Sequence, residues 1–303
     1  MKRAAPPNLL FASPAAETCA RLAPGELFDL VYLDPPYAAG GTRTARTRPG
    51  EARAKDKKRG VPAYDDSRDL AALCAMLETT LVAIKKRLAP HATLVIHLDH
   101  RAVHDAKRLS DEIFGRGAFL GEVIWVPGNG ARGRGLAVTH QTLLFYARRP
   151  SDRSKTRFST EDPLLREPYA NTSLSMHFTH KDDDGRLFRE RTIGKKTYRY
   201  YADQGRRMGS VWMDIPAMSA NTPLLAEGTG YPTQKPLKLL ERIIVATTKE
   251  GDTVADLMCG SGTTLVAATR RGRRFIGGDQ SALAITTTER RLREEGIGFE
   301  RGE

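Results

Sequence analysis

The sequence predicts an α/β protein whose strands are mostly parallel, and two observations support this fold class. Short apolar runs alternate with amphipathic helical segments over most of the 303 residues, which is the pattern of parallel strands joined by right-handed crossovers. Two of the apolar runs end abruptly, one in a proline turn at residues 34–37 and one in a glycine turn within residues 256–264. Open α/β sheets bind their ligands at such strand ends, so these two turns are the first candidates for a site.

In the first half of the chain, a helix is predicted over residues 69–88, where Leu and Ile recur at three- and four-residue steps. The short apolar runs around it are typical of buried strands. Strands are predicted at residues 8–11, 27–33, 93–98, 122–125 and 141–146.

The periodicity fades between residues 147 and 209, where short polar, basic and aromatic groups replace it. It returns near Pro236, where a helix with one apolar face begins. The remaining predicted elements are a strand at 253–257, a helix at 263–271, a strand at 274–277 and a helix at 282–295. The irregular middle is therefore interpreted as an insertion into the sheet or an extension of it.

Composition narrows the function. A net charge of +12 favours a polyanionic partner, because Lys and Arg release counterions from a phosphate backbone. No apolar stretch is long enough to predict a membrane span. Cys19, Cys74 and Cys259 lie far apart and predict neither a disulfide framework nor a metal pair, which suits a reducing, cytoplasmic setting. His100 and His104 lack the glutamate of a zinc-protease motif, and no metal is expected.

The turn Asp34-Pro35-Pro36-Tyr37 directly follows a predicted buried strand. Proline fixes φ and restricts the residue before it, so the turn is stiff. It would hold the Asp34 carboxylate and the Pro35 carbonyl as two fixed acceptors beside an aromatic ring. Such acceptors would bind the two N–H groups of an exocyclic base amine and free its lone pair for attack, while Tyr37 stacks on the flipped base. Taken alone, the motif is equally consistent with a proline turn capped by an aspartate.

The glycine turn has its glycines at 260 and 262 and leads directly into a helix. Glycines let a ligand approach the backbone and meet the N–H groups of the helix. Asp279 follows the next strand, where an acid commonly binds ribose hydroxyls. This half alone suits any nucleotide-like cofactor, and a plain strand–turn–helix remains an alternative.

Together these motifs resemble the β class of amino-DNA methyltransferases, in which the catalytic motif precedes the cofactor motif. The resemblance covers most of the chain. It includes residues 30–37, 122–125, 211–216, 230–236, 251–264 and 272–277. It implies a single Rossmann-like fold with a mostly parallel seven-stranded sheet, with S-adenosylmethionine as cofactor and double-stranded DNA as partner. A cognate restriction enzyme and a homodimer are partners that the family leaves open.

The resemblance also assigns roles to regions of the chain. Residues 1–127 would form the catalytic half of the core, 128–210 the target-recognition region and 211–303 the cofactor half. The loop after Tyr37 would be mobile and close over DNA. The expected catalytic residues are Asp34, Pro35, Pro36 and Tyr37. The expected cofactor residues are Asp256, Leu257, Met258, Cys259, Gly260, Gly262, Thr263, Asp279 and Lys235. The basic, aromatic segment 186–207 supplies the DNA-binding candidates Arg186, Arg189, Arg191, Lys195, Lys196 and Arg199, and a solvated loop with core tyrosines is its alternative.

Two departures from the family concern the cofactor. Leu257 and Met258 stand where the family usually has Pro-Phe, and Met258 can still pack against an adenine ring. Ser13 stands where the family usually has an acid, so it cannot supply a carboxylate to the cofactor adenine.

The family mostly has Asp at the first motif position for adenine N6 and Ser for cytosine N4. Asp34 therefore favours adenine, with cytosine N4 as the alternative. Methyltransferases that act on RNA or on protein amides generally place the cofactor motif first, so the order of motifs here argues against them. An inactive DNA-binding relic is a further alternative, although it would be expected to have lost Asp34 or Gly260.

Overall fold

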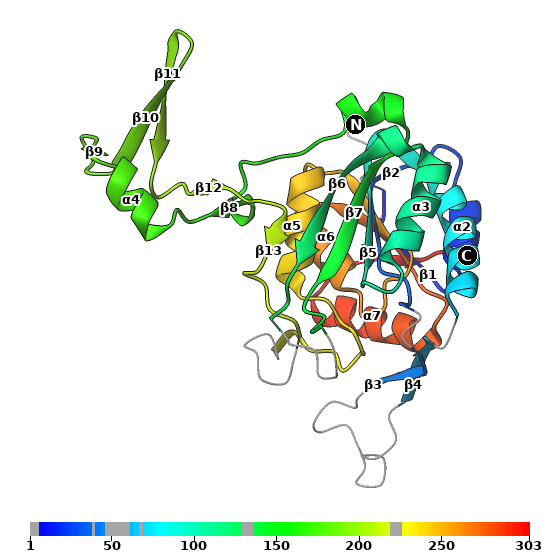
Figure 1. Ribbon diagram of the computed structural model, residues 1–303. Coiled ribbons are helices and arrows are strands. Elements are labelled where there is room, and N and C mark those ends of the chain that lie inside the picture. The colour runs from blue at the N-terminus through cyan, green and yellow to red at the C-terminus, as the bar shows by residue number, and fades with distance from the viewer. Residues whose placement is uncertain (1–5, 38–39, 46–60, 67–68, 129–135, 219–225) are drawn as a thin grey trace, which may run out of the picture. The chain divides into compact units, whose positions relative to one another are not determined.

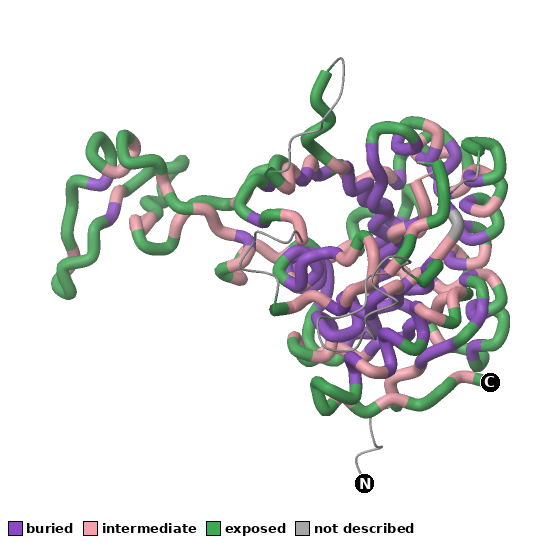
Figure 2. Tube along the Cα trace, turned by 90° about the horizontal axis from the view of Figure 1, so that it is seen from below, coloured by how far each residue is buried: buried purple, intermediate pink, exposed green. Residues whose placement is uncertain are grey.

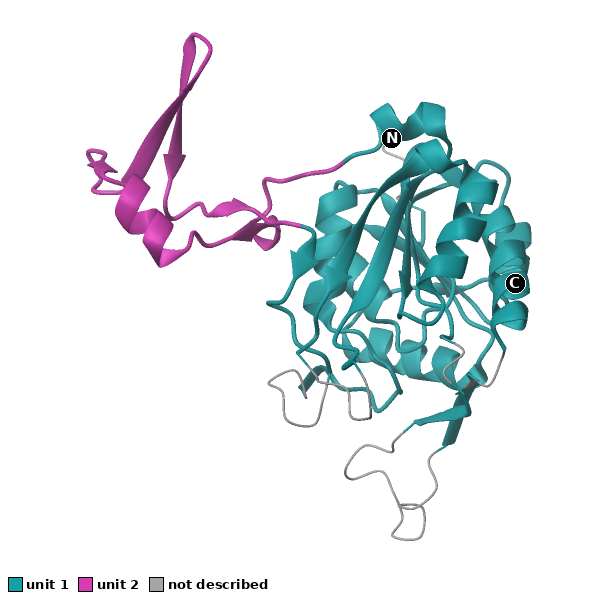
Figure 3. Cartoon of the chain, viewed as in Figure 1, with its two compact units in different colours: residues 1–157, 210–303 teal, residues 158–209 magenta. Residues whose placement is uncertain are grey.

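The computed structural model describes residues 6–37, 40–45, 61–66, 69–128, 136–218 and 226–303. The chain divides into two compact units (Figure 3): a larger one of residues 1–157 and 210–303, and a smaller one of residues 158–209. The smaller unit is shorter than the target-recognition region predicted at 128–210. Part of the predicted region, Gln141–Ala147, forms a strand in the central sheet of the larger unit.

The larger unit is built on a nine-stranded sheet with the order β13-β6-β7-β5-β2-β14-β15-β1-β16. All neighbours in it are parallel except those of β7, which is antiparallel to β5 and β6. The strands are β1 (Leu9–Phe11), β2 (Phe28–Leu33), β5 (Leu88–Leu98), β6 (Phe119–Trp125), β7 (Gln141–Ala147), β13 (Val211–Trp212), β14 (Thr253–Asp256), β15 (Arg274–Gly278) and β16 (Glu300–Arg301). The α/β class is thus confirmed. The expected seven strands are joined by two edge strands of two residues each, β13 and β16.

Helices cover both faces of this sheet (Figure 1). The first group is α1 (Ala15–Arg21), α2 (Leu70–Lys85) and α3 (Val103–Phe114), and the second is α5 (Leu237–Thr247), α6 (Thr263–Arg270) and α7 (Ala282–Glu294). Short 3₁₀ turns lie at Arg116–Ala118 and Pro150–Lys155. One core cluster joins α1, α2 and α3 to the sheet, and Figure 2 shows that buried residues concentrate in this unit. None of the helices in the described ranges is both long and apolar enough to cross a bilayer.

Local sequence signals explain where the key helices begin. Asp69 accepts a hydrogen bond from the Ala72 N–H at 2.6 Å and caps α2, while Ser281 caps α7 through the Ala284 N–H. Such caps satisfy backbone donors that the first turn leaves without partners. The predicted helix over 69–88 is therefore found, but it ends at Lys85, and Leu88 already belongs to β5.

The order of the central strands positions the site. Strands β2, β14 and β15 are parallel neighbours, so their carboxyl ends lie side by side. Each of these ends carries one aspartate: Asp34 directly follows β2, Asp256 closes β14, and Asp279 directly follows β15. Three carboxylates that are far apart in the sequence are thereby brought to one edge of the sheet.

Two antiparallel strands, β3 (Thr42–Ala45) and β4 (Val61–Asp65), form a small sheet after the proline turn. The prediction of a mobile loop after Tyr37 concerned residues 40–60, of which 46–60 lie outside the described residues. The described residues on either side of 46–60 form an antiparallel strand pair whose register shifts between Arg43 and Thr44.

The smaller unit has regular structure where the sequence predicted little. Its main feature is an antiparallel hairpin of β10 (Leu187–Ile193) and β11 (Lys196–Tyr201). Its other elements are a 3₁₀ turn at Pro163–Leu165, β8 (Arg166–Glu167), α4 (Asn171–His177), β9 (His180–Lys181) and β12 (Arg206–Arg207). Few of its residues are buried (Figure 2), so it lacks the apolar periodicity from which strands are usually predicted.

Candidate active site

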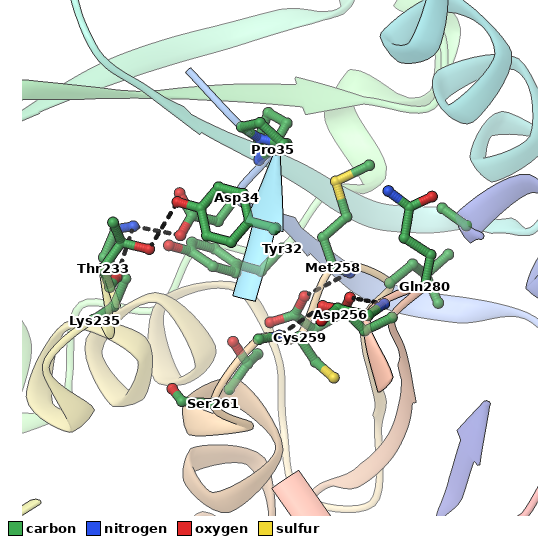
Figure 4. Close-up of a pocket in the computed structure, with 18 of the residues that line it drawn as sticks. Tyr32, Asp34, Pro35, Thr233, Lys235, Asp256, Met258, Cys259, Ser261 and Gln280 are labelled. Atoms are coloured by element: carbon green, nitrogen blue, oxygen red, sulfur yellow. Dashed lines mark hydrogen bonds and ion pairs between the residues drawn. The ribbon is translucent and has the colours of Figure 1, made fainter. Parts of the chain in front are cut away.

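A pocket of about 500 Å³ lies at the carboxyl edge of β2, β14 and β15. This volume is in the range of small-molecule and cofactor sites. All four residues of the proline turn line it, and so do all the predicted cofactor residues except Gly262. The two motifs, more than two hundred residues apart in the chain, therefore share one cavity (Figure 4).

Within the proline turn, Asp34 has hydrogen-bonding partners on both of its carboxylate oxygens. The Tyr37 hydroxyl donates to its Oδ1 at 2.6 Å, and the Lys235 ammonium donates to its Oδ2. Lys235 also lies 5.4 Å from the centroid of the Tyr37 ring. Its side chain is only 9% exposed and that of Asp34 is 19% exposed. The carboxylate is thus held in one orientation by a phenol and a cation.

Asp66 anchors the turn from the adjacent hairpin. Its Oδ1 accepts the backbone N–H of Tyr37 at 2.8 Å, and its Oδ2 pairs with Arg43 at 2.9 Å. Asp66 itself is buried. The sequence around Asp66 did not indicate that it holds the proline turn, because its hydrogen-bonding partners lie in other segments of the chain.

Two buried and uncharged side chains, Tyr32 and His97, form a hydrogen bond next to the proline turn. The hydroxyl of Tyr32 is 2.7 Å from Nδ1 of His97, and both side chains are buried. Burial, together with the nearby Lys235 ammonium, lowers the pKa of His97 to about 3. His97 is therefore uncharged near neutral pH and supports Tyr32 as a hydrogen-bonding partner.

The glycine turn provides the opposite wall. Gly260 and Gly262 have φ angles of +52° and +73°, which residues with a Cβ rarely adopt. A Cβ on Gly260 would lie 3.0 Å from the ring of Tyr231, and one on Gly262 would lie 2.9 Å from Thr288. Gly260 therefore makes room for the ring of Tyr231, whereas Gly262 allows the chain to turn into α6 against α7.

Two carboxyl groups in this wall have raised pKa values. Burial is the main cause for Asp256, with smaller contributions from the Asp34 and Asp279 charges, and its pKa rises to about 7. The pKa of Asp279 is also raised by burial, although its oxygens accept the N–H groups of Gly260 and Ser281 at 2.9 and 2.8 Å. A bound cation or a hydroxyl donor would stabilise both groups in their charged form.

The segment of residues 229–236 closes the pocket on a third side. Its Gln234 side chain accepts the Thr229 N–H at 2.9 Å and donates to the Glu227 carbonyl at 2.8 Å, which holds the segment in a compact turn. Tyr231 stacks on Tyr64 of β4 with ring centroids 6.4 Å apart. This aromatic pair lines the pocket, and no pattern in the sequence marks the two rings as partners.

The two departures from the family differ in whether the substituted residues line the pocket. Met258 lines the pocket, as does Leu257. Ser13 is buried and shares a 2.8 Å hydrogen bond with Thr18, and it is not among the lining residues. Its neighbours Pro14 and Ala15 contribute an apolar surface there instead.

The DNA-binding candidates all lie in the smaller unit, but in different environments. Arg186 pairs with Asp203 at 2.9 Å and Arg199 with Glu190 at 3.2 Å. The Arg189 guanidinium lies over three aromatic rings of the same unit. Arg191, Lys195 and Lys196 are exposed around the hairpin turn.

The comparisons with known proteins agree with this geometry. A family model described as DNA methylase, of the N6/N4 type, matches residues 28–290. The type II methyltransferase M.EcaI of Enterobacter cloacae is 26% identical over 88% of this chain, and the match covers 65% of that relative's length.

Solved structures show the same fold at low sequence identity. The structure of the M1.HpyAVI complex with SAM (S-adenosylmethionine) has a TM-score of 0.53 and 18% identity, and the match covers 94% of this chain and 98% of that one. The cytosine-N4-specific PvuII DNA methyltransferase has a TM-score of 0.57 and 14% identity, and the match covers 96% and 88% of the two chains.

Proposed function

The chain belongs to the N6/N4 family of DNA methylases, and we propose that it transfers a methyl group from S-adenosylmethionine to the N6 amine of adenine in duplex DNA. The observation that carries this proposal is the shared pocket, in which Asp34 of the proline turn and Asp256 and Asp279 of the cofactor side line one cavity. An amine acceptor and a nucleotide-type binding wall are thus within reach of one another.

The residues of the glycine turn fit S-adenosylmethionine. Gly260 lines the pocket without a side chain, which suits the close approach of a ligand to the backbone, and Asp279 presents a carboxylate that suits the ribose hydroxyls. Asp256 is a buried carboxyl group whose charged form a positive ligand would stabilise. When bound, S-adenosylmethionine supplies an electrophilic methyl group on a positively charged sulfur. We assign Leu257, Met258 and Cys259 to the wall around it because all three line the pocket.

Asp34 is the acceptor proposed for the amine. An exocyclic amine is a poor nucleophile because its lone pair is delocalised into the ring. A carboxylate that binds one N–H, with the Pro35 carbonyl for the other, would localise the lone pair at the moment of attack. Tyr37, which also lines the pocket, provides the ring on which a flipped base would stack. No covalent enzyme intermediate is required.

Adenine is proposed over cytosine because the motif begins with Asp rather than Ser. The same acceptors would bind a cytosine N4 amine, so N4 methylation is the second candidate. A cognate restriction enzyme and a homodimer stay predictions.

The experiment is an incubation of the purified chain with labelled S-adenosylmethionine and unmethylated genomic DNA, with matched samples of double-stranded RNA and denatured protein. The DNA is then digested and the labelled nucleoside is identified by mass. N6-methyladenine is expected. N4-methylcytosine would overturn the base assignment, and label in RNA or protein alone would overturn DNA as the substrate. An absence of label in all three samples would support the inactive relic.

A further inference from the structure

The β10–β11 hairpin of the smaller unit presents two chemically different faces. Side chains alternate between the faces of a strand, and directly paired residues share a face. The register pairs Arg191 with Tyr198 and Ile193 with Lys196. These four residues, here called the open face, therefore point to the same side of the hairpin near its turn.

On the opposite face of the hairpin, charged and polar side chains pair with one another. Its Glu190 and Arg199 form an ion pair at 3.2 Å, and the hydroxyls of Thr192 and Thr197 are 3.0 Å apart. Arg199 also lies 4.1 Å from the centroid of the Phe188 ring. Charges and polar groups on this side are neutralised within the hairpin, and little is left to recognise a ligand.

The open face has no such compensation. It carries two cations and no acid, and within the described residues neither Arg191 nor Lys196 forms an ion pair. Ile193 is 53% exposed and Tyr198 is 39% exposed. Lys196 lies 5.2 Å from the Tyr198 ring centroid. Cations interleaved with exposed apolar and aromatic groups are typical of nucleic-acid contacts rather than of a solvated loop.

The end of the hairpin away from its turn packs against a cluster of aromatic rings. Arg189, on the same face as Arg191, lies between 5.2 and 5.6 Å from the rings of Phe178, Tyr200 and Tyr169. Phe178 directly follows α4 and is buried, and Figure 1 shows α4 beside the end of the hairpin away from its turn. The aromatic cluster thus holds the end of the hairpin away from its turn. The turn and its cations project from that end.

We propose that the open face reads the major groove of duplex DNA, an inference that rests on the proposed DNA substrate. The major groove of B-form DNA admits a two-stranded β-ribbon, whereas the deep, narrow major groove of double-stranded RNA does not. Arg191 and Lys196 would contact phosphates or guanine edges, and Ile193 and Tyr198 would contact thymine methyl groups and base edges. Arg186 and Arg199 would contribute little, because their charges are already paired.

The test is a charge-matched comparison of two double variants of the full chain. Arg191→Gln with Lys196→Gln removes two positive charges from the open face. Arg186→Gln with Arg199→Gln removes two positive charges that are already paired. All four residues are exposed, and the circular dichroism and thermal unfolding of each variant check that it is folded.

The open-face variant should bind duplex DNA at least about tenfold more weakly at physiological salt, and its plot of log K against log salt should be shallower by about 1–2, because each lost phosphate contact changes the slope by about 0.9. The paired-charge variant should stay close to the unmodified chain. Equal losses in both variants, no loss in the open-face variant, or equally strong binding of double-stranded RNA would overturn the proposal.

This test separates the groove-reading inference from the proposed function. If the unmodified chain binds duplex DNA through the open face but transfers no methyl group, the groove-reading face stands and the proposed activity fails. If it methylates DNA and the open-face variant methylates and binds equally well, the activity stands and the groove-reading face is wrong.

Discussion

The ammonium of Lys235 is hydrogen-bonded to the Oδ2 of Asp34, although the two residues are 201 positions apart in the chain. With the Tyr37 hydroxyl on Oδ1, both oxygens of the proposed amine acceptor have a partner. Each carboxylate oxygen can accept more than one hydrogen bond. An incoming amine can therefore join this arrangement, and the existing partners fix the direction in which it must approach.

Lys235→Met should lower the single-turnover rate of methyl transfer on the order of 10²-fold, because misplacing a reacting partner by about 1 Å costs that much. Lys235→Arg should recover part of the rate, since it restores a cation beside Asp34. The matched control is Lys238→Met, which removes an exposed lysine paired with Asp214 at 3.0 Å and should leave the rate unchanged. An unchanged rate in Lys235→Met would show that the contact with Asp34 has no role in the reaction.

The affinity for S-adenosylmethionine should rise with pH through about 7. Burial raises the pKa of Asp256 to about 7, so the carboxyl is neutral below that pH and charged above it. A positively charged ligand favours the charged form, and its binding should release a proton. Calorimetry between pH 6 and 8, in buffers of different ionisation enthalpy, measures both effects.

Two controls accompany this measurement. Asp256→Asn cannot ionise, so both the pH dependence and the proton release should disappear. S-adenosylhomocysteine lacks the positive sulfur and should show a smaller pH dependence with the unmodified chain. If S-adenosylmethionine bound equally well at pH 6 and 8, Asp256 would not lie near the charge.

Gly262→Ala should destabilise the fold more than Gly25→Ala. Both glycines have positive φ, +73° and +82°, but only at position 262 would a Cβ collide with Thr288, at 2.9 Å. The strain of the left-handed conformation alone costs about 1–2 kcal/mol, which lowers the Tm by roughly 2–4 °C for each kcal/mol in a chain of this size. Thermal unfolding should show this loss for Gly25→Ala and a larger one for Gly262→Ala. Equal losses would mean that Thr288 moves aside freely.

Asp66→Ala should lower kcat and leave the affinity for the cofactor unchanged. The substitution removes the acceptor of the Tyr37 N–H and the partner of Arg43, so the catalytic turn loses its anchor. Asp66→Asn keeps an oxygen for the Tyr37 N–H and should retain more activity. Asp69→Ala removes the cap of α2 and should cost about 1 kcal/mol of stability with normal kcat. A parallel fall in kcat for both alanine variants would assign Asp66 a purely structural role.

The fold could be predicted because its strands are buried on both faces. Leu30–Leu33 and Val254–Ala255 are continuous apolar runs that lie in the centre of the sheet, and such runs are visible in a sequence. The proximity of Asp34, Asp256 and Asp279 could also be predicted, because each lies at the carboxyl end of a predicted strand. The boundaries were less predictable: β5 begins five residues before the predicted strand, at Leu88, because Leu88 had completed the helical pattern equally well.

The remaining features depend on contacts between distant segments. Nothing near Asp66 or Tyr64 indicated that they would meet Tyr37 and Tyr231. The β10–β11 hairpin was missed because its strands alternate between two largely exposed faces, so no apolar side marks them. Its signal was the β-branched and aromatic residues on both sides of Gly194, which are enriched in strands: Thr192, Ile193, Thr197, Tyr198, Tyr200 and Tyr201.

The proposed activity depends on the hydrogen bond that the amine donates to the Asp34 carboxylate during methyl transfer. The most direct measurement is the single-turnover rate of Asp34→Ala on unmethylated duplex DNA, together with its affinity for S-adenosylmethionine. The rate should be reduced on the order of 10²–10³-fold, the usual effect of losing one hydrogen-bonding group aimed at the reacting centre, with the cofactor still bound. A near-normal rate in this variant would show that Asp34 does not bind the amine during the reaction.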